Sequence, residues 1–256
     1  MGKRGVSAPR GWAGEIDKNS KEMKLPKDEI QTWGESLEGS QPQEILTAAV
    51  GRYRPRIILA CSFGAEDVVL LDMLHRFDPS IGLFYLDTDF LFPETYATRD
   101  RIIERYELKP AQVHEVKSLL TPQQQAQQHG EALWASNPDR CCQLRKVDPL
   151  RRILDGYDAW ITGIRREQSP TRANAKPIEW DNTFELVKVN PLVRWTWTDV
   201  WTYIKVYEVP YNPLHDQHYP SIGCTHCTKP VMPGDDPRSG RWQGRDKTEC
   251  GLHKAS

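Results

Sequence analysis

Cysteine is scarce in this sequence, with six among 256 residues, and no apolar run approaches the ~18 residues that a membrane span needs. The opening MGKRGVSAPRGWAGEI lacks the apolar stretch of a signal peptide, and Val6 stands where N-myristoylation requires Ser or Thr. A net charge of −1 gives no reason to expect a nucleic-acid or membrane partner. We therefore expect a cytoplasmic, reducing environment, where clustered cysteines indicate metal or redox chemistry more often than disulfides.

The composition, 38% hydrophobic and 27% charged, suits one large α/β domain with short extensions. Residues 1–27 are polar and rich in Gly, Lys and Pro, which predicts a flexible N-terminal extension. Residues 28–233 are predicted to form the α/β nucleotide-binding domain, and residues 234–256 a mobile C-terminal tail. Internal repeats and low-complexity blocks are absent from the sequence. The sequence does not determine the oligomeric state, and a homo-oligomer is possible.

Short apolar runs alternate with segments of helical spacing. The runs at 56–61, 82–87, 112–116 and 158–163 predict buried strands, while helices are expected from about 28 to 52, over 65–77 and from Pro93 onward. Strands that alternate with helices of this length favour right-handed βαβ units. The sequence therefore predicts a doubly wound, mainly parallel sheet.

Two loops follow predicted strands at the sheet edge where such folds bind ligands. In CSFGAED, Ser62, Gly64 and the backbone N–H groups at a helix start could cradle an anionic group. In LDTD, Leu86 and Asp87 stand at the carboxyl end of the second predicted strand. A simpler interpretation of the first loop is a plain strand-to-helix turn in which Gly64 supplies a tight bend.

Basic residues gather in two further segments. One is IRREQSPTR, directly after the strand at 158–163, and the other is DDPRSGRWQGRDK near the C-terminus; together they hold Arg165, Arg166, Arg172, Arg238, Arg241, Arg245 and Lys247. Such runs are usually solvated faces. Because guanidinium groups beyond a strand end also suit phosphate or sulfate oxygens, the set predicts a dianionic, nucleotide-like ligand.

Four of the cysteines form two pairs. Cys141 and Cys142 are adjacent, and Cys224 and Cys227 form a C-x-x-C loop in CTHCTKP. Zinc ligand pairs normally keep two to four residues between them, whereas adjacent thiolates diverge on a helix, as the separate irons of a [4Fe–4S] cluster require. This geometry favours the cluster; a zinc site, or two buried cysteines beside a metal-free redox C-x-x-C, are the alternatives.

The remaining cysteines differ in setting. Cys250 lies in TECGLHK near the C-terminus, where a cysteine is usually an incidental exposed thiol. The basic residues of GRWQGRDK could lower its pKa, and a thiolate would be the reactive form. Cys61 is interpreted as a small core residue at a strand end.

These residues together resemble the assimilatory adenylyl-sulfate (APS) reductases, iron–sulfur relatives of the phosphoadenylyl-sulfate (PAPS) reductases. The matching stretches include SFGAEDVVL, YLDTDFLFPETY, CCQLRKVDPL, TGIRREQSPTR, SIGCTHCTKPV, GRW and ECGLH, and they extend from about Arg56 to His253. The resemblance implies an adenine-nucleotide α-hydrolase-like (PP-loop) fold. It also implies thioredoxin-dependent reduction of APS to sulfite and AMP in sulfate assimilation, with thioredoxin or glutaredoxin as thiol donor.

The resemblance further implies roles for single residues. It implies that Cys141, Cys142, Cys224 and Cys227 are the ligands of a [4Fe–4S] cluster and that Cys250 is the nucleophile, which forms an S-sulfocysteine. It places Lys146 between the cluster and the substrate. It also implies that Arg172, Arg238 and Arg241 contact the phosphosulfate. Ser62, Gly64, Leu86, Asp87 and Arg165 complete the predicted substrate site.

The sequence departs from the family pattern at two loops. Cys61 and Phe63 stand where serines are common, and LDTD ends in Asp89 where the family often has glycine. A PAPS reductase, or dual specificity, is the nearest alternative. A zinc-stabilised nucleotide-binding module without catalysis is a more distant alternative. An ATP-using adenylyltransferase or pyrophosphatase is another, but the Ser-Gly-Gly-x-Asp-Ser loop of such enzymes is absent from the sequence.

Overall fold

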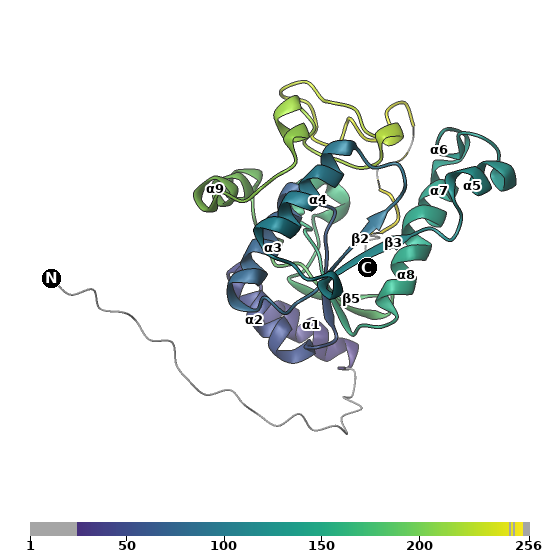
Figure 1. Cartoon of the computed structure of the whole chain (residues 1–256). Helices are drawn as coiled ribbons and strands as arrows, with labels where there is room; N and C mark the ends of the chain where they lie inside the picture. The colour runs from purple at the N-terminus through teal and green to yellow at the C-terminus, as the bar shows by residue number, and fades with distance from the viewer. Residues whose placement is uncertain (1–24, 246, 248, 253–256) are drawn as a thin grey trace.

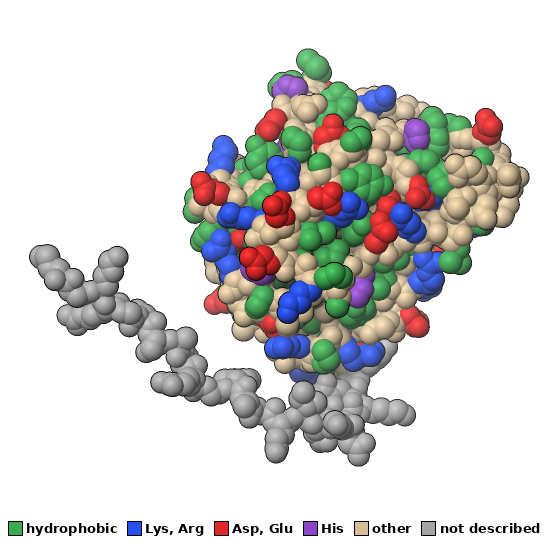
Figure 2. Space-filling model, in the orientation of Figure 1, with side chains coloured by type: hydrophobic (Ala, Val, Ile, Leu, Met, Phe, Trp, Pro, Cys, Tyr) green, Lys and Arg blue, Asp and Glu red, His purple; other side chains and the backbone are tan. Residues whose placement is uncertain are grey.

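A computed structural model describes residues 25–252 apart from 246 and 248. Nearly all of the predicted N-terminal extension, residues 1–27, lies outside the described residues. Basic and acidic side chains are interspersed over the face of the molecule shown in Figure 2, without one large patch of either sign there. Within the described part of the chain, none of the helices has the length and apolar character needed to cross a membrane.

Six strands form one sheet in the order β3-β2-β1-β4-β6-β5. Their bounds are β1 Ile57–Ala60, β2 Leu83–Asp87, β3 Val113–Lys117, β4 Ala159–Ile161, β5 Ile178–Asp181 and β6 Leu186–Val189. Every neighbouring pair is parallel except β5 and β6, which form an antiparallel edge. The predicted doubly wound, mainly parallel sheet is confirmed.

Nine α-helices connect and flank the strands in the described residues (Figure 1). They are α1 Lys27–Ser36, α2 Pro42–Tyr53, α3 Ala65–Phe77, α4 Pro93–Arg105, α5 Pro122–His129, α6 Leu133–Ser136, α7 Pro138–Cys142, α8 Asp148–Leu154 and α9 Trp197–Tyr207. A π-helical turn, Gln143–Val147, joins α7 to α8.

The two faces of the sheet have separate cores, as the alternation of side chains along a strand requires. On β1, Ile57 and Leu59 belong to the larger core, which contains residues of α1 to α4 and α9. Ile58 points to the other face, where it belongs to a smaller core with Leu150 and Leu154 of α8. The sheet is thus covered on both sides, and its open edge for ligands is the carboxyl end of the strands.

The strand order reverses between β1 and β4. From β1 the chain winds outward through β2 and β3, then returns across the sheet to β4 on the other side of β1. Such a switch point leaves a crevice beyond the carboxyl ends of the two central strands. The segment after α9 runs over this end of the molecule (Figure 1), where Thr225 donates its backbone N–H to the carbonyl of Phe90.

Three expectations need correction. The single helix predicted from 28 to 52 is two helices, because the chain turns between Leu37 and Gln41 before Pro42 starts α2. Strands β5 and β6 were not predicted. Gly64 does not supply the bend of CSFGAED: its φ is −74°, and Phe63 takes the left-handed value of 59° instead.

Candidate functional site

The four paired cysteines lie around one small cavity. Cys141, Cys142 and Cys224 are buried and Cys227 is half-buried, and all four line the same cavity. Cys141 and Cys142 end α7, so their side chains diverge on a helix, while Cys224 and Cys227 flank a short 3₁₀ turn. An antiparallel bridge between Leu91 and Cys224 fixes that turn against the loop after β2.

The π-helical turn after the cysteines positions two cations. It carries Arg145 and Lys146, and π-helical turns inside α-helices are frequent at functional sites. The extra residue per turn places Arg145 in the interior, where its side chain is 1% exposed. Both side chains line the cysteine cavity, and only Lys146 also lines the larger pocket at the switch point.

The groups around the four thiols suit an iron–sulfur cluster. Thr88 Oγ1 lies 3.3 Å from Cys224 Sγ and Gln125 Nε2 lies 4.0 Å from Cys141 Sγ. Arg145 Nη2 and Trp242 Nε1 are buried at this cavity without a protein hydrogen-bond partner among the described residues. Buried N–H groups normally have an acceptor, and cluster sulfurs accept such bonds.

A single metal ion fits less well. Among the described residues, no three His, Cys, Asp or Glu side chains are arranged to hold one ion. A [4Fe–4S] cluster takes one thiolate on each iron, so its ligands surround a volume and do not meet at a point. The donor set, four thiols with unpaired N–H groups, therefore fits the cluster better than zinc.

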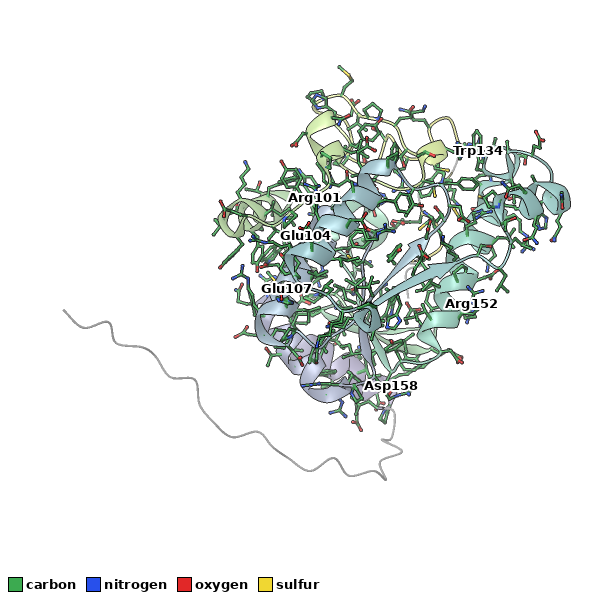
Figure 3. All side chains as sticks on the ribbon, viewed as in Figure 1. Arg101, Glu104, Glu107, Trp134, Arg152 and Asp158 are labelled. Carbon is green, nitrogen blue, oxygen red and sulfur yellow. The ribbon has the colours of Figure 1, made fainter. Side chains whose placement is uncertain are left out.

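An aromatic stack covers the C-x-x-C loop. Trp134 of α6, labelled in Figure 3 beside that loop, stacks on His226 with ring centroids 4.3 Å apart and an interplanar angle of 7°. Phe90 meets the His226 ring edge-on at 5.0 Å. This cover limits access of water to the thiols from one side.

A pocket lies beyond the carboxyl ends of β1 and β4. Ser62, Leu86 and Lys146, three of the predicted substrate residues, line it together with apolar side chains such as Phe84 and Leu150. Gly163 lies two residues after β4, and a Cβ at this position would lie 2.4 Å from Asp67 Oδ1, so only glycine allows the close approach to α3. The pocket has an apolar floor and few polar groups, as nucleoside sites commonly do.

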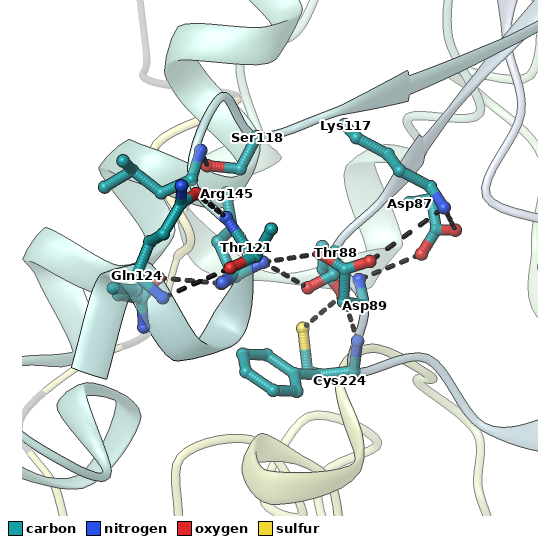
Figure 4. A network of polar contacts seen from close by, with 12 residues as sticks. Asp87, Thr88, Asp89, Lys117, Ser118, Thr121, Gln124, Arg145 and Cys224 are labelled. Carbon is teal, nitrogen blue, oxygen red and sulfur yellow. Dashed lines mark hydrogen bonds and ion pairs between the residues drawn. The ribbon is translucent and has the colours of Figure 1, made fainter. Parts of the chain in front are cut away.

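Two of the predicted substrate residues are used elsewhere in the fold. Asp87 is buried: it accepts hydrogen bonds from Tyr96 and the Asp89 backbone and forms an ion pair with Lys117 (Figure 4). Arg165 is buried too, paired with Glu66 at 2.9 Å and with Glu167 at 2.7 Å. Neither lines the pocket, nor does Gly64, which instead caps the start of α3.

Asp89, where the family often has glycine, also has a structural role. Its φ is 58°, a left-handed value that Asp tolerates better than most residues. Its carboxylate lies 2.8 Å from Arg145 Nη1 and 3.9 Å from Lys117 Nζ (Figure 4). Asp89 thus neutralises Arg145 and does not line the pocket.

Cys250 lies beside two of the predicted cations. Burial opposes ionisation of its thiol, but the charge of Lys146, a hydrogen bond from the Leu252 backbone and the charge of Arg241 together outweigh burial, and the pKa of Cys250 lies below its ordinary value. Arg241 is held by Ser221 Oγ at 3.1 Å and packs on Gly223, where a Cβ would clash with its guanidinium group at 2.3 Å. Leu252 lines the switch-point pocket, so the described end of the tail is docked there.

The other two predicted cations hold a carboxylate of the tail. Glu249 accepts two hydrogen bonds from Arg172, both at 3.0 Å, and lies 3.2 Å from Arg238 Nη2. Burial alone would raise the pKa of Glu249, but the bonds from Arg172 and the charge of Arg238 lower it. Sequence reasoning missed Glu249, although its place next to Cys250 in TECGLHK was a usable signal.

A second, larger pocket of about 480 Å³ lies between α1, β5 and the loop 171–176, compared with about 160 Å³ for the switch-point pocket. Its described lining holds no cysteine and includes Arg172 of the predicted site. Lys146, which also lines the cysteine cavity, lines the smaller pocket and not this one.

The switch-point crevice, the loop from β1 to α3 and the mainly parallel sheet define a PP-loop type of α/β fold. Consistent with this class, an FMN adenylyltransferase structure from Candida glabrata aligns with a TM-score of 0.55 and 16% identity over 89% of this chain and 78% of that chain. Residues 56–230 of this chain match the family described as the phosphoadenosine phosphosulfate reductase domain, and the chain belongs to that family.

Relatives in the family carry two different names. The chain is 52% identical to an adenosine 5'-phosphosulfate reductase of Shouchella clausii, over 85% of this chain and 89% of the relative. It is 46% identical to a phosphoadenosine 5'-phosphosulfate reductase of Gloeobacter violaceus, over 90% and 96%. A crystal structure of phosphoadenylyl-sulfate (PAPS) reductase from Candida auris, a phosphate complex, aligns with a TM-score of 0.71 and 32% identity over 81% of this chain and 99% of that chain.

Proposed function

We propose that this protein reduces adenylyl sulfate to sulfite and AMP in assimilatory sulfate reduction, with Cys250 as the nucleophile. The observation that carries the proposal is the position of Cys250. The pKa of its thiol is lowered by the charges of Lys146 and Arg241, and both Lys146 and Leu252, two residues after Cys250, line the switch-point pocket. Names of relatives at 49–52% identity support the substrate.

The first half of the reaction is a transfer of the sulfonate group. The Cys250 thiolate attacks the sulfur of APS, the bond between that sulfur and the bridging oxygen breaks, and AMP leaves with the electron pair. The enzyme is left with an S-sulfocysteine. Lys146 and Arg241 are placed to stabilise charge that develops on the bridging oxygen and the sulfonate, and one such contact is worth about 2.7–4 kcal/mol in known oxyanion sites.

The second half needs a thiol donor, which we propose is thioredoxin or glutaredoxin in the reducing cytoplasm. One donor thiolate attacks Cys250 Sγ, sulfite leaves, and the second donor thiol resolves the mixed disulfide. The donor dithiol becomes a disulfide while sulfur(VI) becomes sulfur(IV), so electrons balance without another reductant. Cys250 must leave the docked position to meet so bulky a partner, which requires the mobile tail predicted for residues 234–256.

We propose a [4Fe–4S] cluster held by Cys141, Cys142, Cys224 and Cys227. When bound, it supplies a fixed local charge and a link between α7 and the C-x-x-C loop. Arg145 and Trp242 would donate to its sulfurs through the N–H groups that have no other partner in the described protein. Because two donor thiols already provide both electrons, a change in cluster oxidation state during turnover would contradict this role.

APS is favoured over PAPS by the charges of the pocket. Among its described lining residues Lys146 is the one cation, and Asp67 adds a carboxylate close to Ser62. A 3'-phosphate placed there would meet a like charge without a second cation to offset it. Dual specificity or PAPS reduction remains the competing proposal, and competition between equal concentrations of the two nucleotides separates them.

The test is an anaerobic incubation of the purified protein with sulfur-35-labelled APS without a thiol donor. We expect one equivalent of label on the peptide that contains Cys250, stoichiometric release of AMP, and four irons per chain. Cys250→Ser should retain the irons and take up no label. Adding thioredoxin should release the label as sulfite.

Two outcomes would overturn the proposal. A protein that holds one zinc, takes up no label and behaves identically after Cys250→Ser would be a nucleotide-binding module without catalysis. Label that appears on another residue would remove Cys250 from the chemistry and leave the tail without a catalytic role.

A further inference from the structure

Arg145 carries a buried positive charge at the wall of the cysteine cavity. Its side chain is 1% exposed and lines that cavity together with the four paired cysteines. Nε donates a hydrogen bond to Gln125 Oε1 at 2.7 Å, and Nη1 donates to the carbonyl of Thr88 at 3.0 Å. Nη2 has no hydrogen-bond partner among the described residues. Because solvent screens a charge at this depth only weakly, it acts strongly on the groups around it.

Asp89 supplies the charge that balances Arg145. Asp89 Oδ2 accepts a hydrogen bond from Arg145 Nη1 at 2.8 Å, and both residues lie in the network drawn in Figure 4. Lys117, another cation of that network, lies 3.1 Å from Asp87 and 3.9 Å from Asp89, so Asp87 is its main partner. The other two acceptors of Arg145, an amide and a carbonyl, are neutral. The carboxylate of Asp89 therefore determines whether Arg145 adds a net positive charge to the cavity.

We propose that Asp89 lowers the reduction potential of the cluster by neutralising Arg145. The inference rests on the [4Fe–4S] cluster of the proposed function. The reduced cluster carries one more negative charge than the oxidised one, so an unbalanced cation in the wall of the cavity favours reduction. Lys146, which also lines the cavity, adds its charge whether or not Asp89 is present. Asp89 is thus a positioning residue that acts through Arg145 and keeps the cluster oxidised while the donor dithiol supplies both electrons.

Asp89→Asn isolates the charge, because asparagine has nearly the same shape, can accept the bond from Arg145 and tolerates the left-handed backbone angle at this position. The potential is measured by electron paramagnetic resonance during reduction against dyes of known potential. We expect it to rise by about 59 mV or more, which is a tenfold change in a one-electron equilibrium. Glu104→Gln, which removes the same charge from the exposed face of α4 (Figure 3), should leave it unchanged. An unshifted or lower potential in Asp89→Asn would overturn the inference.

A second variant covers the case in which Asp89→Asn does not retain four irons. Asp89→Gly removes the same charge and accepts the left-handed angle without strain, so it should raise the potential in the same direction. Loss of iron from both variants would overturn the inference, because the pair of Asp89 and Arg145 would then retain the cluster and not tune it. If the potential shifts but Cys250 takes up no sulfur-35 label from APS, the proposed function fails and the inference stands. If Cys250 is labelled and the potential does not shift, the inference alone fails.

Discussion

At the scale of single residues, the loops beside the pocket hold two residues with left-handed backbone angles, Phe63 and Asp89. In each case, contacts of the side chain offset the cost of the left-handed backbone angle. The Phe63 side chain is 1% exposed and meets Tyr85 edge-on at 5.4 Å, and Asp89 neutralises the buried Arg145. A residue other than glycine is kept at each position because its side chain contributes more than the backbone angle costs.

Substitutions of Asp89 separate these two effects. Asp89→Ala should lower the free energy of unfolding by about 1–3 kcal/mol, since a buried guanidinium group loses its carboxylate. Asp89→Gly loses the same partner but relieves the left-handed angle, so it should be about 1 kcal/mol more stable than Asp89→Ala. Denaturant unfolding gives both values. Alanine as stable as aspartate would show that Arg145 does not need this charge.

Asp67 provides a pH-dependent test. Burial raises the pKa of Asp67 to about 6, and the two hydrogen bonds from Ser62 only partly oppose this. Because the folded state holds this proton more tightly than the unfolded state, Asp67 makes stability fall as pH rises from about 4 to about 6. The loss is complete above that range.

Asp67→Asn should remove this pH dependence. The variant should gain about 1–3 kcal/mol relative to the unaltered protein on going from pH 4 to pH 7, as expected for a rise of about two pKa units in a partly exposed carboxyl. The measurement is chemical unfolding of both proteins across this range, and taking the difference between them cancels the other titrating groups. A difference that stays constant with pH would contradict the raised pKa.

At the scale of elements, hydrophobic periodicity was enough for the central part of the fold. The runs that became β1 to β4 and the helices α3 and α4 were predicted within a few residues. The central strands β1, β2 and β4 are mostly buried, and such strands are short, mainly apolar segments. The edge strand β5 and its neighbour β6 have four residues each and carry the charged Glu179 and Lys188, so periodicity does not identify them.

For the site, residue type and spacing predicted the cysteine cavity, since Cys141, Cys142, Cys224 and Cys227 have few other uses in one small cluster. Spacing does not say which way a charged side chain points. Asp87 ends β2 and Arg165 follows β4, but their charges are paired with Lys117 and Glu66. The Glu249 contacts depend on how the tail docks, which involves partners nearly eighty residues apart in the chain.

At the scale of the whole molecule, the cysteines connect two parts of the chain that have no shared sheet. Cys141 and Cys142 belong to the helical segment after α6, and Cys224 and Cys227 to the irregular segment after α9. Burial raises the pKa of Cys141 and Cys227 and raises that of Cys142 to about 12, so without metal these thiols are neutral near pH 7. The proposed [4Fe–4S] cluster, with one thiolate on each iron, would link these segments.

Removal of that group should loosen these segments and leave the sheet intact. After iron is chelated under reducing conditions, amide hydrogen exchange should become at least about tenfold faster in residues 138–147 and 221–229, as expected for local opening, while β1 and β4 keep their protection. Local loosening is expected because the two central strands pack between two cores that do not contain the cysteine pairs. The untreated protein is the reference. Uniform loss of protection would mean that the cluster supports the entire fold, and unchanged exchange would mean that contacts such as the Leu91–Cys224 bridge hold the segments without it.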